Sequence, residues 1–226
     1  MITMKTNIAT LFLFIISQHM YAQGTYDTNY VNWYYQQRME LYNSIPAEDH
    51  DIVFLGNSIT ERGEWQELIP GKTVANRGIG GDITFGVLAR IDNVVALKPG
   101  KLFLLIGIND IGRFFPVELI VENYEKIIKE LRNGLPRTTI YVQSVLPLNE
   151  SVLQYDYLKG HRERILKLNS EIQRLAREHN LVYVDLHEVF ANESGDLKPE
   201  YTSDGIHVNS RAYIDWVAYL KRKKYL

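Results

Sequence analysis

The sequence contains no cysteine among its 226 residues. A chain without cysteine forms no disulfide and carries no thioether-linked lipid, so packing alone must hold the folded protein together. An excess of one charge sign is also lacking, because the net charge at pH 7 is −2. Nucleic acids and anionic bilayers are bound through clustered Lys and Arg side chains. We therefore expect neither of them as a partner.

Long hydrophobic runs are missing as well. The apolar run near the N-terminus, residues 9–16, has about eight residues, whereas a helix needs about 20 to span a bilayer. We expect no stable membrane insertion. Lys5 precedes this run and a polar stretch leads from it to Ala22, which is typical of a cleaved signal peptide. The sequence predicts a signal peptide over residues 1–22 and a secreted or periplasmic protein; a buried core segment is the alternative.

Motifs for cofactors and metals are absent too. The stretch "NRGIGGD" at residues 76–82 does not fit the dinucleotide-binding pattern, because Ile83 stands where its third glycine would fall. The stretch "GKT" at residues 71–73 lacks the first glycine of a P-loop, since Gln66 occupies that position. No HExxH motif or cysteine pair occurs. We expect no cofactor and no metal.

Apolar segments alternate with amphipathic ones along the chain. Continuously apolar strands separated by amphipathic helices indicate a parallel sheet covered on both faces. We predict an α/β fold, a three-layer α/β/α sandwich with a five-stranded parallel sheet, built by one domain over residues 23–226. The expected strands are residues 51–55, 73–76, 101–106, 138–145 and 181–186, and the expected helices include residues 32–46 and the stretches around residues 120–131 and 165–175.

Small polar blocks follow several of these strands. They are Gly56-Asn57-Ser58, "NRGIGGD", "GIND" at residues 107–110 and, before the last helical segment, "SDGIH" at residues 203–207. Each block alone has an ordinary explanation as a turn, a helix cap or a surface loop. In open parallel sheets, however, ligands collect at the carboxyl ends of the strands. The four blocks together therefore predict a site at that edge.

The blocks and their order resemble those of the SGNH hydrolases, also called GDSL esterases. Gly56-Asn57-Ser58-Ile59 is similar to the first block, with Asn57 where the family more often has Asp and Ile59 where it has Leu. Gly81, "GIND" and "DGIH" match the other three, and the resemblance runs from about residue 51 to the end. It implies the flavodoxin-like SGNH hydrolase fold and an acyl-enzyme mechanism.

Physical chemistry gives each matched residue a role. The Ser58 hydroxyl is a weak nucleophile unless a base takes its proton, and His207 is the candidate base. Asp204 is near enough in sequence to hold the imidazole in one tautomer. We expect the oxyanion to be bound by the backbone N–H groups of Ser58 and Gly81 and by the side-chain amide of Asn109.

Other polar residues near these blocks receive lesser roles. Asn57 and Asp82 are expected to support or cap neighbouring structure. His187 follows the fifth expected strand with Asp185 nearby, and it is the alternative base. The remaining candidates are interpreted as surface residues: His50, His161 and His179.

The substrate is constrained mainly by the resemblance. The residues around "NRGIGGDIT" are similar to platelet-activating-factor acetylhydrolase-like enzymes and to secreted bacterial carbohydrate O-acetylesterases, which implies short acyl groups, mostly acetyl. The 15 tyrosines are compatible with aromatic packing on sugar rings. We expect a small-molecule or glycan ester as substrate. A lysophospholipase, a thioesterase and a non-catalytic sugar-binding module remain alternatives, and the oligomeric state is left open.

Overall fold

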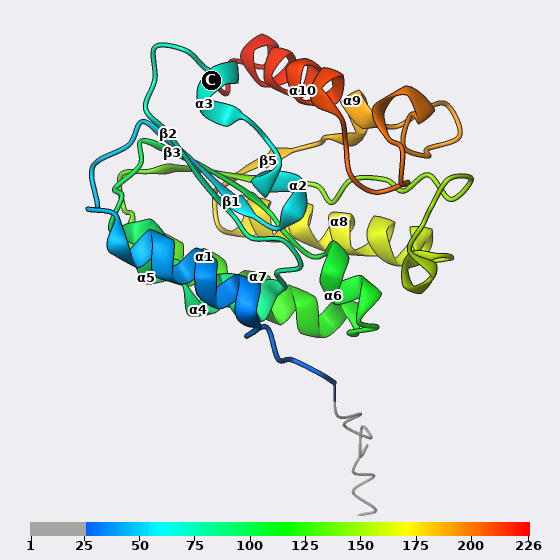
Figure 1. Cartoon of the computed structure of the whole chain (residues 1–226), viewed down its shortest axis with the longest axis horizontal. Helices are drawn as coiled ribbons and strands as arrows, with labels where there is room; N and C mark the ends of the chain where they lie inside the picture. Colours follow the sequence, from blue (N-terminus) through cyan, green and yellow to red (C-terminus); the bar gives the residue numbers. More distant parts are fainter. Residues whose placement is uncertain (1–25) are drawn as a thin grey trace, which may run out of the picture.

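A computed structural model describes residues 26–226. The predicted signal peptide, residues 1–22, lies outside the described residues, as do residues 23–25 of the predicted domain. The described part contains a five-stranded sheet with the order β2-β1-β3-β4-β5, and all neighbouring strands are parallel (Figure 1). This confirms the predicted sheet. The strands are β1 (Ile52–Gly56), β2 (Val74–Gly78), β3 (Lys101–Leu105), β4 (Thr139–Gln143) and β5 (Val182–Val184).

The central strands are apolar on both faces because both faces are covered. Val53, Phe54 and Leu55 of β1 are fully buried. The register places Phe54 beside Phe103, and Phe103 beside Tyr141 of β4. Their rings stack with centroid separations of 4.8 and 4.4 Å, so a row of aromatic rings ties three strands together on one face.

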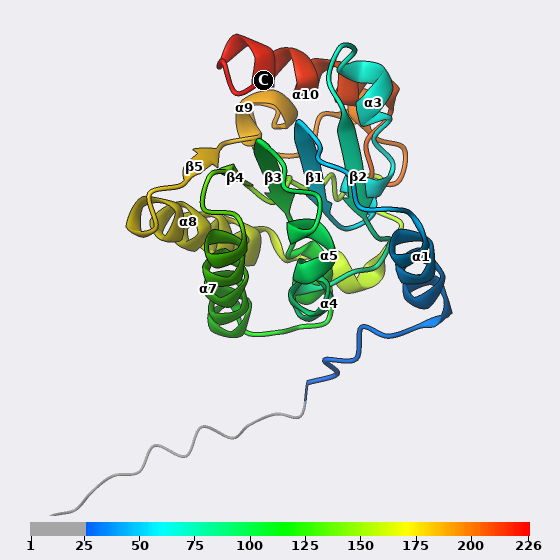
Figure 2. The same cartoon turned by 90° about the vertical axis from the view of Figure 1, so that its left-hand side faces the viewer.

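Helices form a layer on each side of the sheet (Figures 1 and 2). One layer holds α3 (Trp65–Leu68), α9 (His187–Phe190) and α10 (Ser210–Arg222), and the other holds α4 (Thr84–Ala89), α5 (Ile91–Val95), α7 (Val117–Gly134) and α8 (Arg162–Glu178). The predicted helix at residues 32–46 is α1 (Trp33–Ser44), which lies beside the second layer. Two short helices, α2 (Ser58–Glu61) and α6 (Ile108–Gly112), follow β1 and β3.

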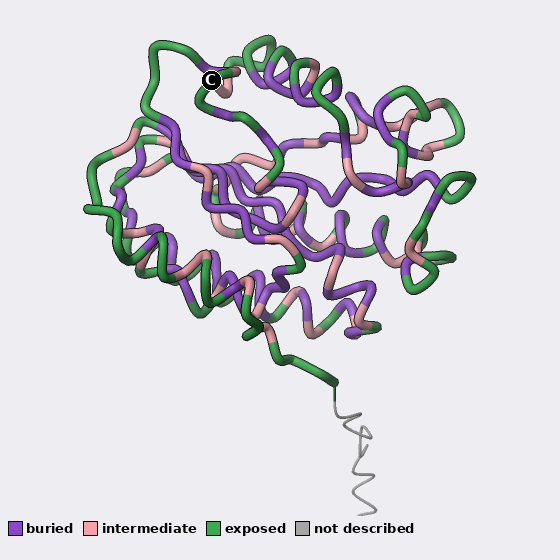
Figure 3. Tube along the Cα trace, viewed as in Figure 1, coloured by how far each residue is buried: buried purple, intermediate pink, exposed green. Residues whose placement is uncertain are grey.

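The two long helices of the second layer follow the predicted spacing. The apolar residues that define this spacing are buried: Ile120, Tyr124, Ile127 and Leu131 in α7, and Ile165, Leu168, Ile172 and Leu175 in α8. Figure 3 shows the same division, with buried strands at the centre and exposed outer turns on the helices. No helix within residues 26–226 is both long and apolar enough to cross a membrane.

The C-terminal helix α10 is fixed to the sheet by polar contacts as well as by packing. The Trp216 indole N–H donates to Gln143 Oε1 at 3.0 Å. The Tyr213 hydroxyl donates to the carbonyl oxygen of Ile59 in α2 at 2.6 Å. The loop that precedes α10 is thereby held next to α2.

Candidate active site

The turn between β1 and α2 presents Ser58. Asn57 is the N-cap of α2, and its side-chain oxygen accepts the N–H of Ile59 at 3.0 Å. A Cβ atom at Gly56 would lie 2.2 Å from the carbonyl oxygen of Leu105, and one at Gly78 would lie 2.2 Å from the backbone nitrogen of Glu61. Only glycine allows this close approach of strands and helix. Strand β1 thus runs into small residues because Ser58 must stand at its end.

Three predicted residues form one chain of hydrogen bonds. Ser58 Oγ lies 2.9 Å from His207 Nε2, and His207 Nδ1 lies 2.6 Å from Asp204 Oδ2. The other carboxylate oxygen of Asp204 accepts the backbone N–H groups of His207 at 2.8 Å and Ile206 at 3.1 Å. The loop before α10 therefore fixes its own carboxylate, which in turn orients the imidazole toward Ser58.

Burial and hydrogen bonding set the charge states in this chain. Burial lowers the pKa of His207 and outweighs the opposing effect of Asp204. Burial alone would raise the pKa of Asp204, but hydrogen bonds from His207 and Ile206 bring it below its ordinary value. At neutral pH the imidazole is uncharged and the carboxylate is ionised. We assign the ring proton to Nδ1, because the carboxylate accepts there, which leaves Nε2 free to accept from Ser58.

Two of the predicted oxyanion donors, Gly81 and Asn109, meet at the turn after β2, where Asn109 bonds to Asp82. A Cβ atom at Gly80 would lie 4.0 Å from Ser58 Cβ, so the turn after β2 adjoins the serine, and Gly81 adopts a φ of +76° within that turn. The backbone N–H groups of Ser58 and Gly81 donate to no other described residue. Asn109 Nδ2 donates one hydrogen to the carbonyl oxygen of Asp82 at 2.8 Å, and its second hydrogen is available.

Comparison with known proteins agrees with this geometry. Residues 54–213, which include all four blocks, match the GDSL-like Lipase/Acylhydrolase family. The chain belongs to this family. The chicken (Gallus gallus) platelet-activating factor acetylhydrolase IB subunit alpha2 is 24% identical over 172 residues, which cover 74% of this chain and 72% of that protein.

Solved structures show the same fold. A Streptococcus pneumoniae protein described as a platelet activating factor is 34% identical, with a TM-score of 0.75 over 84% of this chain and 92% of that one. A GDSL-like lipase from Bacteroides thetaiotaomicron is 23% identical, with a TM-score of 0.68 over 85% and 98% of the chains. An acetylxylan esterase from Geobacillus stearothermophilus is 18% identical, with a TM-score of 0.62 over 78% and 95%. The SGNH hydrolase fold is confirmed, and the family is one of carboxylic ester hydrolases.

In this GDSL-like hydrolase a buried ion pair supports the turn that carries Gly81. Arg90 Nη2 lies 2.8 Å from Asp82 Oδ2, and both side chains are inaccessible to solvent. The same guanidinium donates to the carbonyl oxygens of Gly56 at 3.0 Å and Arg77 at 2.8 Å, which lie in β1 and β2. Burial raises the pKa of Asp82, and Arg90 opposes that rise. Asp82 has the supporting role expected from sequence, whereas Arg90 was missed.

Asp110 has a partner that sequence reasoning did not identify. The sequence allows the block "GIND" to cap the helix that follows it, but Asp110 lies inside α6 and is buried. Its carboxylate accepts the Thr84 hydroxyl at 2.5 Å and the Thr84 N–H at 3.0 Å. Asp110 therefore caps α4 from across the sheet edge, and burial raises its pKa to about 6.

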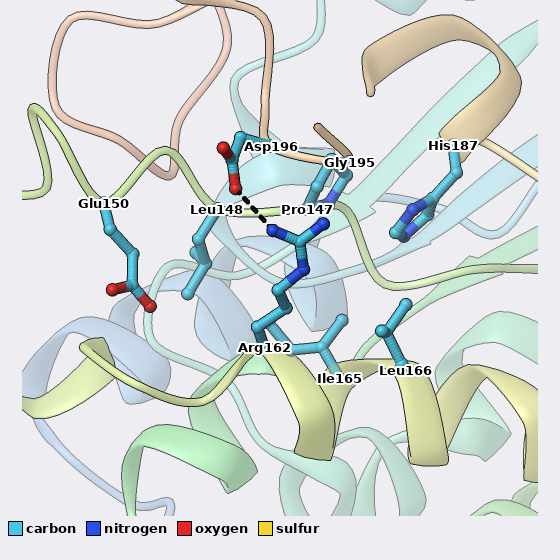
Figure 4. A pocket seen from close by; sticks show the side chains of 9 residues that line it. All are labelled: Pro147, Leu148, Glu150, Arg162, Ile165, Leu166, His187, Gly195 and Asp196. Atoms are coloured by element: carbon cyan, nitrogen blue, oxygen red, sulfur yellow. Dashed lines mark hydrogen bonds and ion pairs between the residues drawn. The ribbon is translucent and has the colours of Figure 1, made fainter. Parts of the chain in front are cut away.

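His187, the alternative base, does not adjoin Ser58. Its Nε2 lies 3.1 Å from the carbonyl oxygen of Val145. It lines a separate cavity of about 290 Å³ between α8 and the loop around Asp196, where Arg162 pairs with Asp196 at 3.0 Å (Figure 4). The lining of that cavity includes neither Ser58 nor His207. The structure thus favours His207 over His187.

Aromatic residues border the site, and sequence reasoning assigned none of them. The Tyr155 ring meets the His207 ring edge to face at 5.9 Å. Helix α1 supplies Tyr34, whose hydroxyl donates to Glu61 at 2.5 Å and whose ring lies 3.4 Å from the position of a Cβ at Gly80. Two different segments of the chain thereby provide aromatic walls beside the predicted nucleophile.

Proposed function

We propose that this protein is an exported serine esterase that removes short acyl groups, chiefly acetyl, from carbohydrates. The hydrogen-bonded chain from Ser58 through His207 to Asp204 carries the proposal. An uncharged imidazole that accepts from a serine hydroxyl at 2.9 Å is poised to act as a general base. No other described histidine is placed beside Ser58.

The reaction follows from this geometry. Ser58 Oγ attacks the ester carbonyl carbon while its proton passes to His207 Nε2, and Asp204 stabilises the imidazolium. The N–H groups of Ser58 and Gly81 and the free amide hydrogen of Asn109 bind the oxyanion. Collapse of the intermediate breaks the bond to the alcohol, which leaves with the proton from His207. Water then attacks the acyl-serine with the same base, and the carboxylic acid is released.

The preference for a short acyl group and a sugar alcohol is supported by relatives and by the surroundings of the site. The chicken relative is an acetylhydrolase, and an acetylxylan esterase shares the fold. Tyr155 and Tyr34 offer aromatic faces of the kind that pack on sugar rings. Export rests on the predicted signal peptide, and cleavage after Ala22 would leave Gln23 as the mature N-terminus. N-terminal sequencing of the secreted protein tests this part, and an intact Met1 would contradict it.

Acetate release from acetylated xylan, pectin, sialic acid and peptidoglycan fragments tests the substrate, alongside p-nitrophenyl esters of two to twelve carbons. We expect activity on acetyl esters and a steep loss with chain length. Ser58→Ala should lower kcat by about 10⁴-fold or more, whereas the exposed Ser170→Ala should leave it unchanged. A preference for long acyl chains would instead indicate a lipase or thioesterase, and glycan binding without turnover would indicate a binding module.

A further inference from the structure

The end of helix α6 contains an unusual residue. Phe114 has a φ of +60°, in the left-handed region. Its N–H donates to the Ile111 carbonyl at 2.9 Å, and the Phe115 N–H donates to the Asp110 carbonyl at 3.0 Å. This pair of bonds is the Schellman motif, whose left-handed position is usually glycine or asparagine.

The fold does not account for phenylalanine at this position. A left-handed conformation costs a residue other than glycine about 1 kcal/mol. Burial of the ring could offset that cost, but Phe114 is 60% exposed. Helices α8 and α10 end in the same motif with the polar residues Asn180 at φ +54° and Lys224 at φ +60°. An exposed aromatic ring is therefore held in a strained conformation with little burial to offset the cost.

A series of rings leads from His207 to helix α6, at whose end Phe114 stands. The Tyr155 ring lies 5.9 Å from His207 and 5.8 Å from Tyr157. Tyr157, which is 49% exposed, packs on the backbone of α6, since a Cβ at Gly112 would lie 2.9 Å from its ring. Phe114 follows two residues later, supported by an edge contact with His161 at 5.1 Å. We call Tyr155, Tyr157 and Phe114 the aromatic strip.

We propose that Phe114 and Tyr157 form a stacking subsite for a sugar ring next to the one whose ester is cleaved. This inference rests on the proposed function and specifies how a glycan chain would lie. A fatty acyl chain on these exposed rings would keep most of its surface in water. A sugar ring needs only one apolar face covered, and its hydroxyl groups stay hydrated. Asp156 precedes Tyr157 and pairs with Lys159 at 2.6 Å, and this exposed ion pair supplies polar partners for those hydroxyls.

The variant Phe114→Gly separates this role from a structural one. Glycine relieves the backbone strain, so the melting temperature should rise by a few degrees. Loss of the stacking ring should lower kcat/KM for an acetylated xylotetraose by about fivefold to tenfold. Hydrolysis of p-nitrophenyl acetate, which has no second sugar ring to stack on Phe114, should stay within twofold. Phe114→Tyr should retain activity on the oligosaccharide.

Lys224→Gly is the matched control, because Lys224 has the same motif and the same φ as Phe114. Lys224 lies far from the site: the carbonyl oxygen of the next residue, Tyr225, accepts from Lys101 at the start of β3, at the end of the sheet opposite to Ser58. The Lys224→Gly change should raise the melting temperature without changing either activity. An unchanged kcat/KM of Phe114→Gly on the oligosaccharide would overturn the proposal, as would a selective loss on long acyl esters.

A binding measurement keeps the subsite distinct from the proposed function. Calorimetric titration of the Ser58→Ala protein with unacetylated xylotetraose, cellotetraose and chitotetraose requires no turnover. We expect at least one of them to bind, and the additional change Phe114→Gly should weaken its Kd about fivefold or more. Failure of the esterase assay with binding intact would reject the proposed function alone, whereas equal affinities with and without Phe114 would reject the subsite.

Discussion

Asn109 donates its side-chain amide to the backbone carbonyl of Asp82 at 2.8 Å. The bond joins α6, which follows β3, to the turn that follows β2. It also fixes the plane of the amide, so that the second hydrogen has a defined direction. One side chain therefore connects two loops of the site and offers a donor to the proposed oxyanion.

Replacement of Asn109 by alanine tests both contributions. Loss of an oxyanion donor should lower kcat on p-nitrophenyl acetate by about 10²- to 10³-fold with a small change in KM. Loss of the bond to Asp82 should lower the free energy of unfolding by about 1 kcal/mol. Steady-state kinetics and urea titration measure the two effects. The exposed Asn43→Ala is the control, and a kcat within threefold of wild type for Asn109→Ala would remove Asn109 from the oxyanion site.

The pH dependence of kcat/KM reports His207. Only the uncharged imidazole accepts the Ser58 proton, so activity disappears as the pH falls through the pKa of His207. Because burial lowers this pKa, the acid limb should have its midpoint below the ordinary value of about 6.5. The pH profile on p-nitrophenyl acetate between pH 4 and 8 provides the check. A midpoint above 7 would mean that the environment favours the imidazolium.

The variant Asp204→Asn tests the role of the Asp204 carboxylate, because it keeps the shape of the side chain and removes its negative charge. Its amide can donate toward His207 Nδ1, which would move the ring proton to Nε2 and block acceptance from Ser58. We expect kcat to fall about 10⁴-fold, as in other serine triads, while the melting temperature changes little. Imidazole ¹⁵N shifts would show the change of tautomer. Normal turnover by Asp204→Asn would indicate that His207 acts without this carboxylate.

The close approach of β2 to α2 gives a prediction about Gly78. A Cβ there would lie 2.2 Å from the Glu61 nitrogen, so Gly78→Ala must displace the helix that begins with Ser58. We expect about 1–3 kcal/mol loss of stability together with a loss of activity. Gly71→Ala is the control, because Gly71 has a φ of +80° with open space around it, and strain alone should cost about 1 kcal/mol without affecting kcat. Equal effects of the two variants on kcat would argue against steric positioning of Ser58.

The sequence predicts those site residues whose positions are fixed by a short local segment. Each strand is an apolar run, and the residues after β1 and β3 are placed by the strand itself, so Ser58 and Asn109 could be identified. His187 shows the limit of this reasoning. It follows β5 at the same edge, but the order β2-β1-β3-β4-β5 puts β5 three strands from β1, or about 14 Å at about 4.8 Å per strand. The strand order cannot be read from apolar periodicity.

The roles of Arg90 and Phe114 could not be predicted from sequence either, because they are determined by tertiary contacts. Arg90 stands in the apolar stretch "FGVLARIDNVV", where a charge is conspicuous, but nothing local identifies Asp82, Gly56 and Arg77 as its partners. Phe114 follows Arg113 with no sequence signal for a left-handed residue. The left-handed conformation of Phe114 is set by the two hydrogen bonds that end α6.

The buried pair of Asp82 and Arg90 yields the last prediction. Arg90→Met leaves a buried carboxylate without its partner and should reduce the free energy of unfolding by about 3–5 kcal/mol, with a parallel fall in kcat because the Gly81 turn loosens. Adding Asp82→Asn removes the unpaired charge, so the double variant should be more stable than Arg90→Met alone.

Urea titration at several pH values measures these stabilities. The pKa of Asp82 is raised in the folded state, and loss of Arg90 should raise it further. At Asp82 the folded Arg90→Met protein then binds more protons than the unfolded chain, so its stability relative to the wild-type protein should increase as the pH is lowered from 7 to 5. Because protonation neutralises the buried charge, the double variant should lack this gain. If this relative stability instead falls on acidification, or if the two single effects simply add in the double variant, the ion pair does not support this turn in the way the structure indicates.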